Sequence, residues 1–164
     1  MKKDFFKDSK IKFPAYEPWI SKEDKKIVNK ALNQSMLTLG PQLEKFESDF
    51  CKYSNSKYAI AVSNCTAALH LSLMALGIKK NDEVIIPDLT FVADANAILA
   101  CNAKPVITDI NKENFFLSIS NIKKNITKKT KAIIPVHIYG QVCNIDEILD
   151  VAKDNNLKVI EDCA

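Results

Sequence analysis

The spacing of apolar residues changes near residue 57, which divides the chain into two parts. In the first part the spacing is helical, and Ser21 followed by Asp24 resembles a capping box that begins a helix. The apolar stripe of this helix comprises Ile27, Val28, Ala31 and Leu32. Gly40 and Pro41 interrupt the pattern, and a second helix is predicted from Leu43, Phe46 and Phe50. We therefore expect residues 1–57 to form an N-terminal helical segment.

From Tyr58 onward, short runs rich in β-formers alternate with helical stretches. The runs are YAIAVS to Ser63, EVIIP to Pro87, KPVITDI to Ile110, KAIIPVH to His137 and LKVIED to Asp162. Most are nearly continuous in apolar residues, which is typical of strands buried on both faces. Their ends follow at intervals of about 25 residues, the length of a strand and a crossover helix. Residues 58–164 are predicted to be α/β, a three-layer sandwich around a mostly parallel, mixed sheet.

The composition excludes several classes of protein. Apolar residues make up 47% and charged residues 26%, as in a globular domain. No apolar run approaches the length of about 20 residues that crosses a bilayer, and MKKDFFKDSK lacks the apolar core of a signal peptide. We therefore expect a cytoplasmic protein without a membrane partner. The 5 cysteines form neither a zinc-ligand pattern nor a disulfide framework, so no metal site is expected.

The glycines and the absence of arginine exclude further kinds of binding site. The 3 glycines are too far apart for a Gly-rich dinucleotide loop, a P-loop or a nucleophile elbow. All 23 basic residues are lysine, and arginine is the usual residue for reading bases and phosphates in pairs of hydrogen bonds. A nucleic-acid partner is not expected.

Ligands of an open α/β sheet bind beyond the carboxyl ends of its strands. There, Asn64 and Thr66 precede a helical run, whose start is either an ordinary N-cap or a phosphate site. Phe91 follows a strand and either stacks on a flat cofactor or packs in the core. His137 ends another strand and is read as structural.

The last predicted strand ends with two acids, Glu161 and Asp162. Strand alternation places their side chains on opposite faces, which excludes an acid/base pair. One carboxylate either binds a cation or a protonated ring nitrogen, or is simply a helix cap or a surface carboxylate. The chain stops two residues later, without a covering helix, so we expect a fragment of a longer protein.

In order and spacing these segments resemble the DegT/DnrJ/EryC1/StrS sugar aminotransferases, a family of pyridoxal-phosphate enzymes with the aspartate aminotransferase fold. The segments are TLGPQLEKFESDF (38–50), AVSNCTAALHLSLMALGI (61–78), DEVIIPDLTFVADANAI (82–98), TKAIIPVHIYGQ (130–141) and VIEDCA (159–164). The family usually has Gly at the position of Cys65, often Thr at that of Asp94, and Gly near Asn102.

The resemblance implies a role for each candidate residue. Cys65 and Thr66 would bind the phosphate of pyridoxal 5'-phosphate, and Phe91 would stack on its ring. Asp162 would pair with the protonated ring nitrogen, and His137 would lie nearby. The catalytic lysine that forms the Schiff base is expected beyond Ala164, and the small C-terminal domain is expected to be absent from this chain.

The resemblance further implies an aminotransferase that moves an amino group from a donor such as glutamate onto a nucleotide-linked keto sugar. The product would serve surface polysaccharide or amino-sugar biosynthesis, and the full enzyme would be a homodimer. The chain alone is expected to be inactive. Two alternatives stay open, a sugar dehydratase of the same family and a non-enzymatic α/β binding domain.

Overall fold

The computed structural model describes residues 18–164, which fall into two compact units, up to Ala61 and from Val62. The first part of the expected N-terminal helical segment, residues 1–17, lies outside the described residues. In the described residues no helix has both the length and the apolar character needed to cross a membrane.

The first unit contains two helices, α1 (Lys22–Leu32) and α2 (Pro41–Ser54). The predicted capping box is present, because Asp24 N–H donates to Ser21 Oγ and Ser21 N–H donates to Asp24 Oδ2. Pro41 occupies the first turn of α2, where its missing N–H costs nothing. Neither helix buries a residue, and Ile27, Val28 and Leu32 of the predicted apolar stripe of α1 are exposed.

The second unit is built on a four-stranded sheet in the order β2-β1-β3-β4. All three strand pairs are parallel, as predicted for buried strands linked by crossover helices. In chain order its elements are α3 (Cys65–Ala75), β1 (Glu83–Pro87), α4 (Ala93–Ala100), β2 (Lys104–Thr108), α5 (Ile119–Asn125), β3 (Thr130–Ile133), a 3-10 turn (Ile138–Gly140), α6 (Ile145–Asp154) and β4 (Lys158–Val159).

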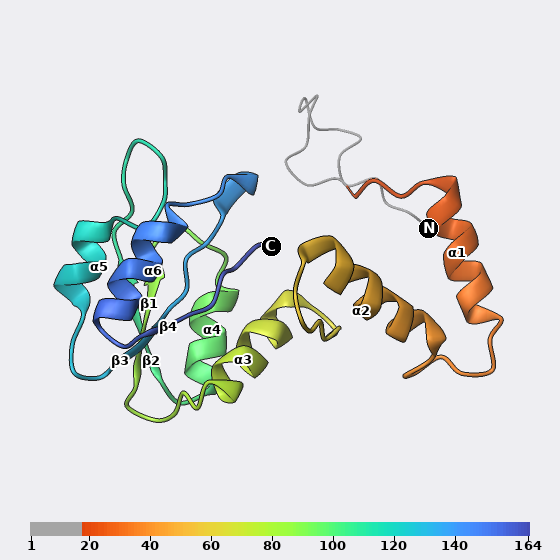
Figure 1. Ribbon diagram of the computed structural model, residues 1–164, viewed down its shortest axis with the longest axis horizontal. Helices are drawn as coiled ribbons and strands as arrows, with labels where there is room; N and C mark the ends of the chain where they lie inside the picture. Colours follow the sequence, from red (N-terminus) through yellow and green to blue (C-terminus); the bar gives the residue numbers. More distant parts are fainter. Residues whose placement is uncertain (1–17) are drawn as a thin grey trace, which may run out of the picture. The chain divides into compact units, whose positions relative to one another are not determined.

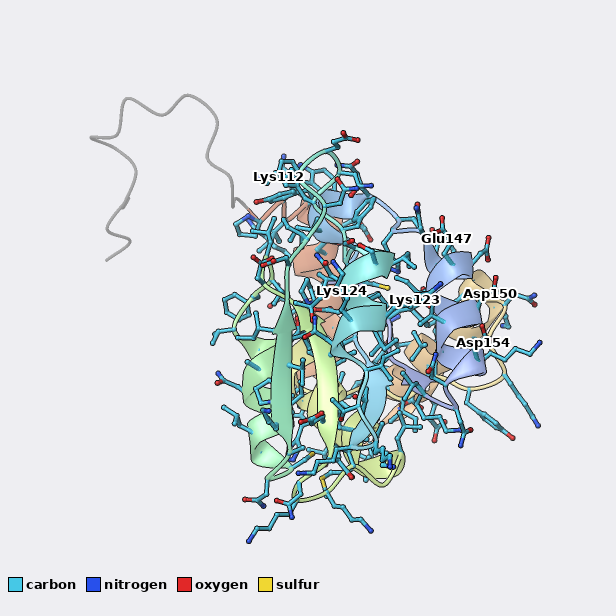
Figure 2. All side chains as sticks on the ribbon, turned by 90° about the vertical axis from the view of Figure 1, so that its left-hand side faces the viewer. Lys112, Lys123, Lys124, Glu147, Asp150 and Asp154 are labelled. Carbon is cyan, nitrogen blue, oxygen red and sulfur yellow. The ribbon has the colours of Figure 1, made fainter. Side chains whose placement is uncertain are left out.

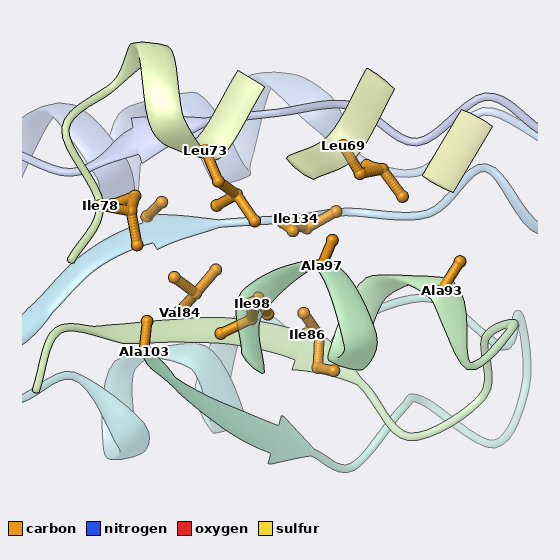
Figure 3. Close-up of a cluster of buried hydrophobic side chains, with 11 residues drawn as sticks. Leu69, Leu73, Ile78, Val84, Ile86, Ala93, Ala97, Ile98, Ala103 and Ile134 are labelled. Atoms are coloured by element: carbon orange, nitrogen blue, oxygen red, sulfur yellow. The ribbon is translucent and has the colours of Figure 1, made fainter. Parts of the chain in front are cut away.

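The sheet lies between two helical layers, with α3 and α4 on one side and α5 and α6 on the other (Figure 1). Strand alternation divides β1 between the two cores, since Val84 and Ile86 face α3 and α4 while Ile85 faces α5 and α6. Figure 3 shows Leu73 of α3 and Ala97 of α4 in the first of these cores. The α/β sandwich expected from the rhythm of the sequence is thus present.

The layer of α5 and α6 is amphipathic. Ile122 and Ile148 are buried against the sheet. The outward residues are charged, with Lys123 and Lys124 on α5 beside acidic residues of α6, which include Glu147 (Figure 2). Charged outer faces of this kind mark the solvent side of a helix that covers a sheet.

Four of the five predicted strands differ from the observed ones, and the smallest difference is that β2 stops at Thr108 instead of Ile110. The strand expected over 58–63 is absent, because this segment pairs with no described strand, and Tyr58 and Ile60 are exposed. The strands expected to end at His137 and Asp162 stop at Ile133 and Val159, although an isolated parallel bridge joins Val136 to Asp162. An apolar run indicates an extended backbone but does not reveal where a neighbouring strand accompanies it.

Candidate active site

The backbone of Asp162 is fixed at the carboxyl end of the sheet. Its N–H donates to the Pro135 carbonyl at 2.9 Å, and its own carbonyl accepts from the His137 N–H at 3.0 Å. These two hydrogen bonds form the bridge to the neighbouring segment and determine the face on which each of the last side chains lies. Asp162 accordingly points toward α3, and Glu161 points away from it.

The Asp162 carboxylate meets the start of α3. Its Oδ1 atom lies 3.5 Å from the Sγ atom of Cys65 and accepts from the Ala164 N–H at 3.0 Å. Only 6% of Asp162 is exposed. Burial raises the pKa of the Cys65 thiol, and the charge of Asp162 raises it further, so the thiol stays protonated and donates to the carboxylate. A helix start and a strand end that lie 97 residues apart in sequence are thus in contact.

The first turn of α3 has free hydrogen-bond donors. Asn64 caps the helix, because its Oδ1 atom accepts from the Ala67 N–H at 2.9 Å. In the part of the chain that the structure describes, no acceptor is paired with the N–H groups of Cys65 and Thr66. Both residues are exposed, so their N–H groups and the positive end of the helix dipole are available to an anion. The next N–H along the helix, that of Ala67, is already used by the cap.

Phe91 does not pack in the core. It lies between β1 and α4, and 74% of it is exposed. Of the two readings that the sequence left open, core packing is therefore wrong for the described residues. A large exposed aromatic ring near a strand end is available to stack on a flat ligand.

His137 is oriented away from the Asp162 carboxylate. Its Nδ1 atom accepts from the Cys143 N–H at 3.2 Å, and its Nε2 atom lies 3.0 Å from Glu161 Oε2. An Nδ1 atom that accepts carries no proton, so the ring has its proton on Nε2 and donates it to Glu161. The contact of His137 with Asp162 runs through the backbone N–H alone.

The sequence did not single out Asp94 as a functional residue. It lies in the first turn of α4 with no exposed surface, and the Thr90 hydroxyl donates to its Oδ2 atom. Its Oδ1 atom is buried without a hydrogen-bond partner. The signal was present in the sequence, because Asp94 shares a helix face with the apolar residues Ala97 and Ile98, where an acid is unusual.

These residues fit a flat, phosphate-bearing ring with a protonated nitrogen. The start of α3 has unpaired N–H groups for the phosphate, Phe91 presents an exposed aromatic face, and Asp162 is a buried carboxylate for the cation. Pyridoxal 5'-phosphate has this set of features. Cys65, Thr66, Phe91 and Asp162 all lie in the second unit of the chain.

Comparison with known proteins gives one family. The sequence pattern of the DegT/DnrJ/EryC1/StrS aminotransferase family matches residues 18–164. A GDP-perosamine synthase of Escherichia coli O157:H7 is 45% identical over 152 residues, which are 92% of this chain and 42% of that protein. This chain therefore spans less than half the length of that relative.

Solved structures agree with this match. A putative sugar aminotransferase from Streptococcus pneumoniae, in its pyridoxal-phosphate form, has a TM-score of 0.87 and 29% identity, over 93% of this chain and 43% of that one. A GDP-4-keto-6-deoxymannose-3-dehydratase with a trapped pyridoxal phosphate–glutamate geminal diamine has a TM-score of 0.83 and 27% identity, over 92% and 41% of the two chains. The fold is that of these pyridoxal-phosphate enzymes, and the chain belongs to the DegT/DnrJ/EryC1/StrS aminotransferase family.

Proposed function

We propose that the protein carrying this chain is a pyridoxal-phosphate-dependent aminotransferase. It moves an amino group from an amino-acid donor such as glutamate onto a nucleotide-linked keto sugar. The observation that carries the proposal is the contact between the start of α3 and Asp162, which brings an anion-binding helix end beside a buried carboxylate. Family membership and the name of the Escherichia coli relative support the class of substrate.

The cofactor, when bound, acts as an electron sink for the substrate carbon. The N–H groups of Cys65 and Thr66 hold its phosphate, together with the Thr66 hydroxyl. Phe91 covers one face of its ring, and Asp162 keeps the ring nitrogen protonated through a buried, negatively charged contact. His137 does not contact the cofactor and acts indirectly. Its backbone N–H donates to the Asp162 carbonyl, and its ring is hydrogen-bonded to Glu161.

The same proposal extends to the whole protein. Residues 1–57 form an N-terminal helical segment, and residues 58–164 form the first part of the cofactor-binding domain. The protein acts in the cytoplasm as a homodimer, and its product serves amino-sugar or surface polysaccharide synthesis. The lysine that forms the Schiff base with the cofactor lies outside this chain.

Replacement of Asp162 tests the proposal in the full-length protein. In Asp162→Asn the ring nitrogen loses its anionic partner, so transamination of a nucleotide-linked 4-keto sugar with glutamate should fall by roughly a hundredfold or more. The matched control is Asp150→Asn on the exposed face of α6, which should retain the rate of the unmodified protein. Turnover by Asp162→Asn at the level of this control would contradict the role of Asp162.

A sugar dehydratase is the second candidate, supported by the similarity to the solved 3-dehydratase. Both reactions use the same cofactor, but their products differ in composition. Mass spectrometry of the sugar product separates them, because transamination adds an amino group while dehydration removes a hydroxyl group. Cofactor binding without either product would favour the non-enzymatic binding domain.

A further inference from the structure

Asp94 is a buried acid that the proposed function does not use. None of its surface is exposed, and its Oδ1 atom has no hydrogen-bond partner. Leaving an ionised carboxylate oxygen buried and unpaired costs far more free energy than burying a protonated, neutral acid. The burial of Oδ1 therefore favours a proton on this atom, which changes it from an unsatisfied acceptor into a donor.

The Asp162 carboxylate is the candidate acceptor for such a proton, because it points toward α3, which packs against the helix α4 that carries Asp94. The effect of Asp162 on the pKa of Asp94 agrees with this placement. Burial raises the pKa of Asp94 to about 6, the Thr90 hydroxyl opposes the increase, and Asp162 adds to it. The two carboxyl groups come from α4 and from the segment after β4, two parts of the chain that the fold brings together.

The surroundings of Asp94 contain little that would stabilise a second negative charge. The titratable groups that act on it, or on which it acts, are Asp162 and the Cys65 thiol of α3, and both are acids. No lysine or histidine among residues 18–164 contributes to its pKa. The start of α4 favours a negative charge, but this effect is weaker than full burial beside a second carboxylate.

We propose that Asp94 is a positioning residue that carries a proton on Oδ1 and donates it in a hydrogen bond to Asp162, so that the pair holds one proton. Thr90 holds the other oxygen of Asp94 and so orients the donor. Asp94 in this way fixes the rotamer of Asp162. The effect on cofactor binding rests on the proposed function. The proton between Asp94 and Asp162 does not, because no cofactor is needed to hold it.

The proton is tested in the full-length protein without cofactor, by carboxyl NMR of protein labelled with carbon-13 aspartate. We expect one aspartate resonance to titrate near pH 6 and to be absent from Asp94→Asn. Titration of every aspartate below pH 5 would overturn the inference. This result is independent of cofactor binding, so it also decides the inference if the proposed function fails.

The positioning role is tested with pyridoxal phosphate at pH 5.5. Asp94→Asn keeps a donor toward Asp162 and an acceptor for Thr90, so its dissociation constant should stay within about threefold of the unmodified value. Asp94→Val removes both hydrogen bonds at similar size, and its dissociation constant should rise by about tenfold or more. Equal affinities of the Asn and Val variants would overturn the positioning role while leaving cofactor binding, and hence the proposed function, intact.

Discussion

At Asp94, stability depends on pH, because burial raises the pKa of this residue to about 6 in the folded protein, above the value of 3.8 for the free side chain. The folded state therefore holds this proton more tightly than the unfolded state. Between pH 4 and pH 6 the unfolded state binds fewer protons, so the free energy of unfolding falls as the pH rises. Above pH 6 the free energy of unfolding has fallen by its full amount, and below pH 4 it has not yet fallen.

Replacement of this acid should accordingly stabilise the protein at alkaline pH. At pH 8, Asp94→Asn should raise the free energy of unfolding by up to about 3 kcal/mol, and at pH 4 the two proteins should differ little. Denaturant unfolding of the cofactor-free protein at both pH values measures the difference. Asp150→Asn is exposed and should show no such dependence on pH. A gain from Asp94→Asn that is equal at both pH values would contradict the raised pKa.

The same residue shows what a sequence leaves undetermined. Alternation along the last strand correctly placed Glu161 and Asp162 on opposite faces, because that rule needs only neighbouring residues. The environment of Asp94 depends on Asp162, which lies far away in sequence. Its position in an apolar stripe was visible in the sequence, whereas its partner becomes evident only in the fold.

Among the helices and strands, α3 is the one whose start both follows from a local sequence signal and forms part of the candidate site. Its Asn64 cap holds the Ala67 N–H and leaves the two preceding N–H groups free. Asn64→Ala should lower the free energy of unfolding by about 1 kcal/mol, because the first turn loses its side-chain acceptor. Asn64→Asp, which keeps the acceptor, is the matched control and should restore the stability in thermal unfolding. An Ala variant as stable as this control would show that the cap contributes nothing.

Helix starts were predictable because their signals are local. Ser21 with Asp24, Asn64 before α3, and Pro41 in the first turn of α2 all act within one turn of the chain. Strands depend on neighbours that a local pattern does not identify. The apolar run over 58–63 matches β1 in character, yet β1 has a partner strand on each side, whereas that run pairs with no described strand.

At the scale of the whole molecule, the exposed apolar side chains of α1 and α2 should govern how the chain associates. Helices α1 and α2 bury no residue, and large side chains such as Ile27, Val28 and Leu32 lie exposed on α1. Contiguous apolar surface of this kind promotes association between chains. We expect the 164-residue chain, produced alone, to self-associate at micromolar concentration.

Sedimentation velocity at several concentrations measures this association. A variant with Gln at positions 27, 28 and 32 removes the apolar stripe of α1 and retains good helix formers, so it should shift the distribution toward the monomer. A monomer at all concentrations in the unmodified chain would contradict the expectation. The charged outer faces of α5 and α6 offer the control surface, because Glu147→Gln there should leave the distribution unchanged (Figure 2).

The contact between Cys65 and Asp162 also sets an order of events during synthesis. The start of α3 leaves the ribosome 97 residues before the carboxylate that it meets. At 5–20 residues per second this interval lasts about 5 to 20 seconds. During that time the nascent chain has the start of α3 but not the carboxylate that this helix contacts. On the proposed function, a cofactor can contact both parts of its site only after residue 162 has been translated.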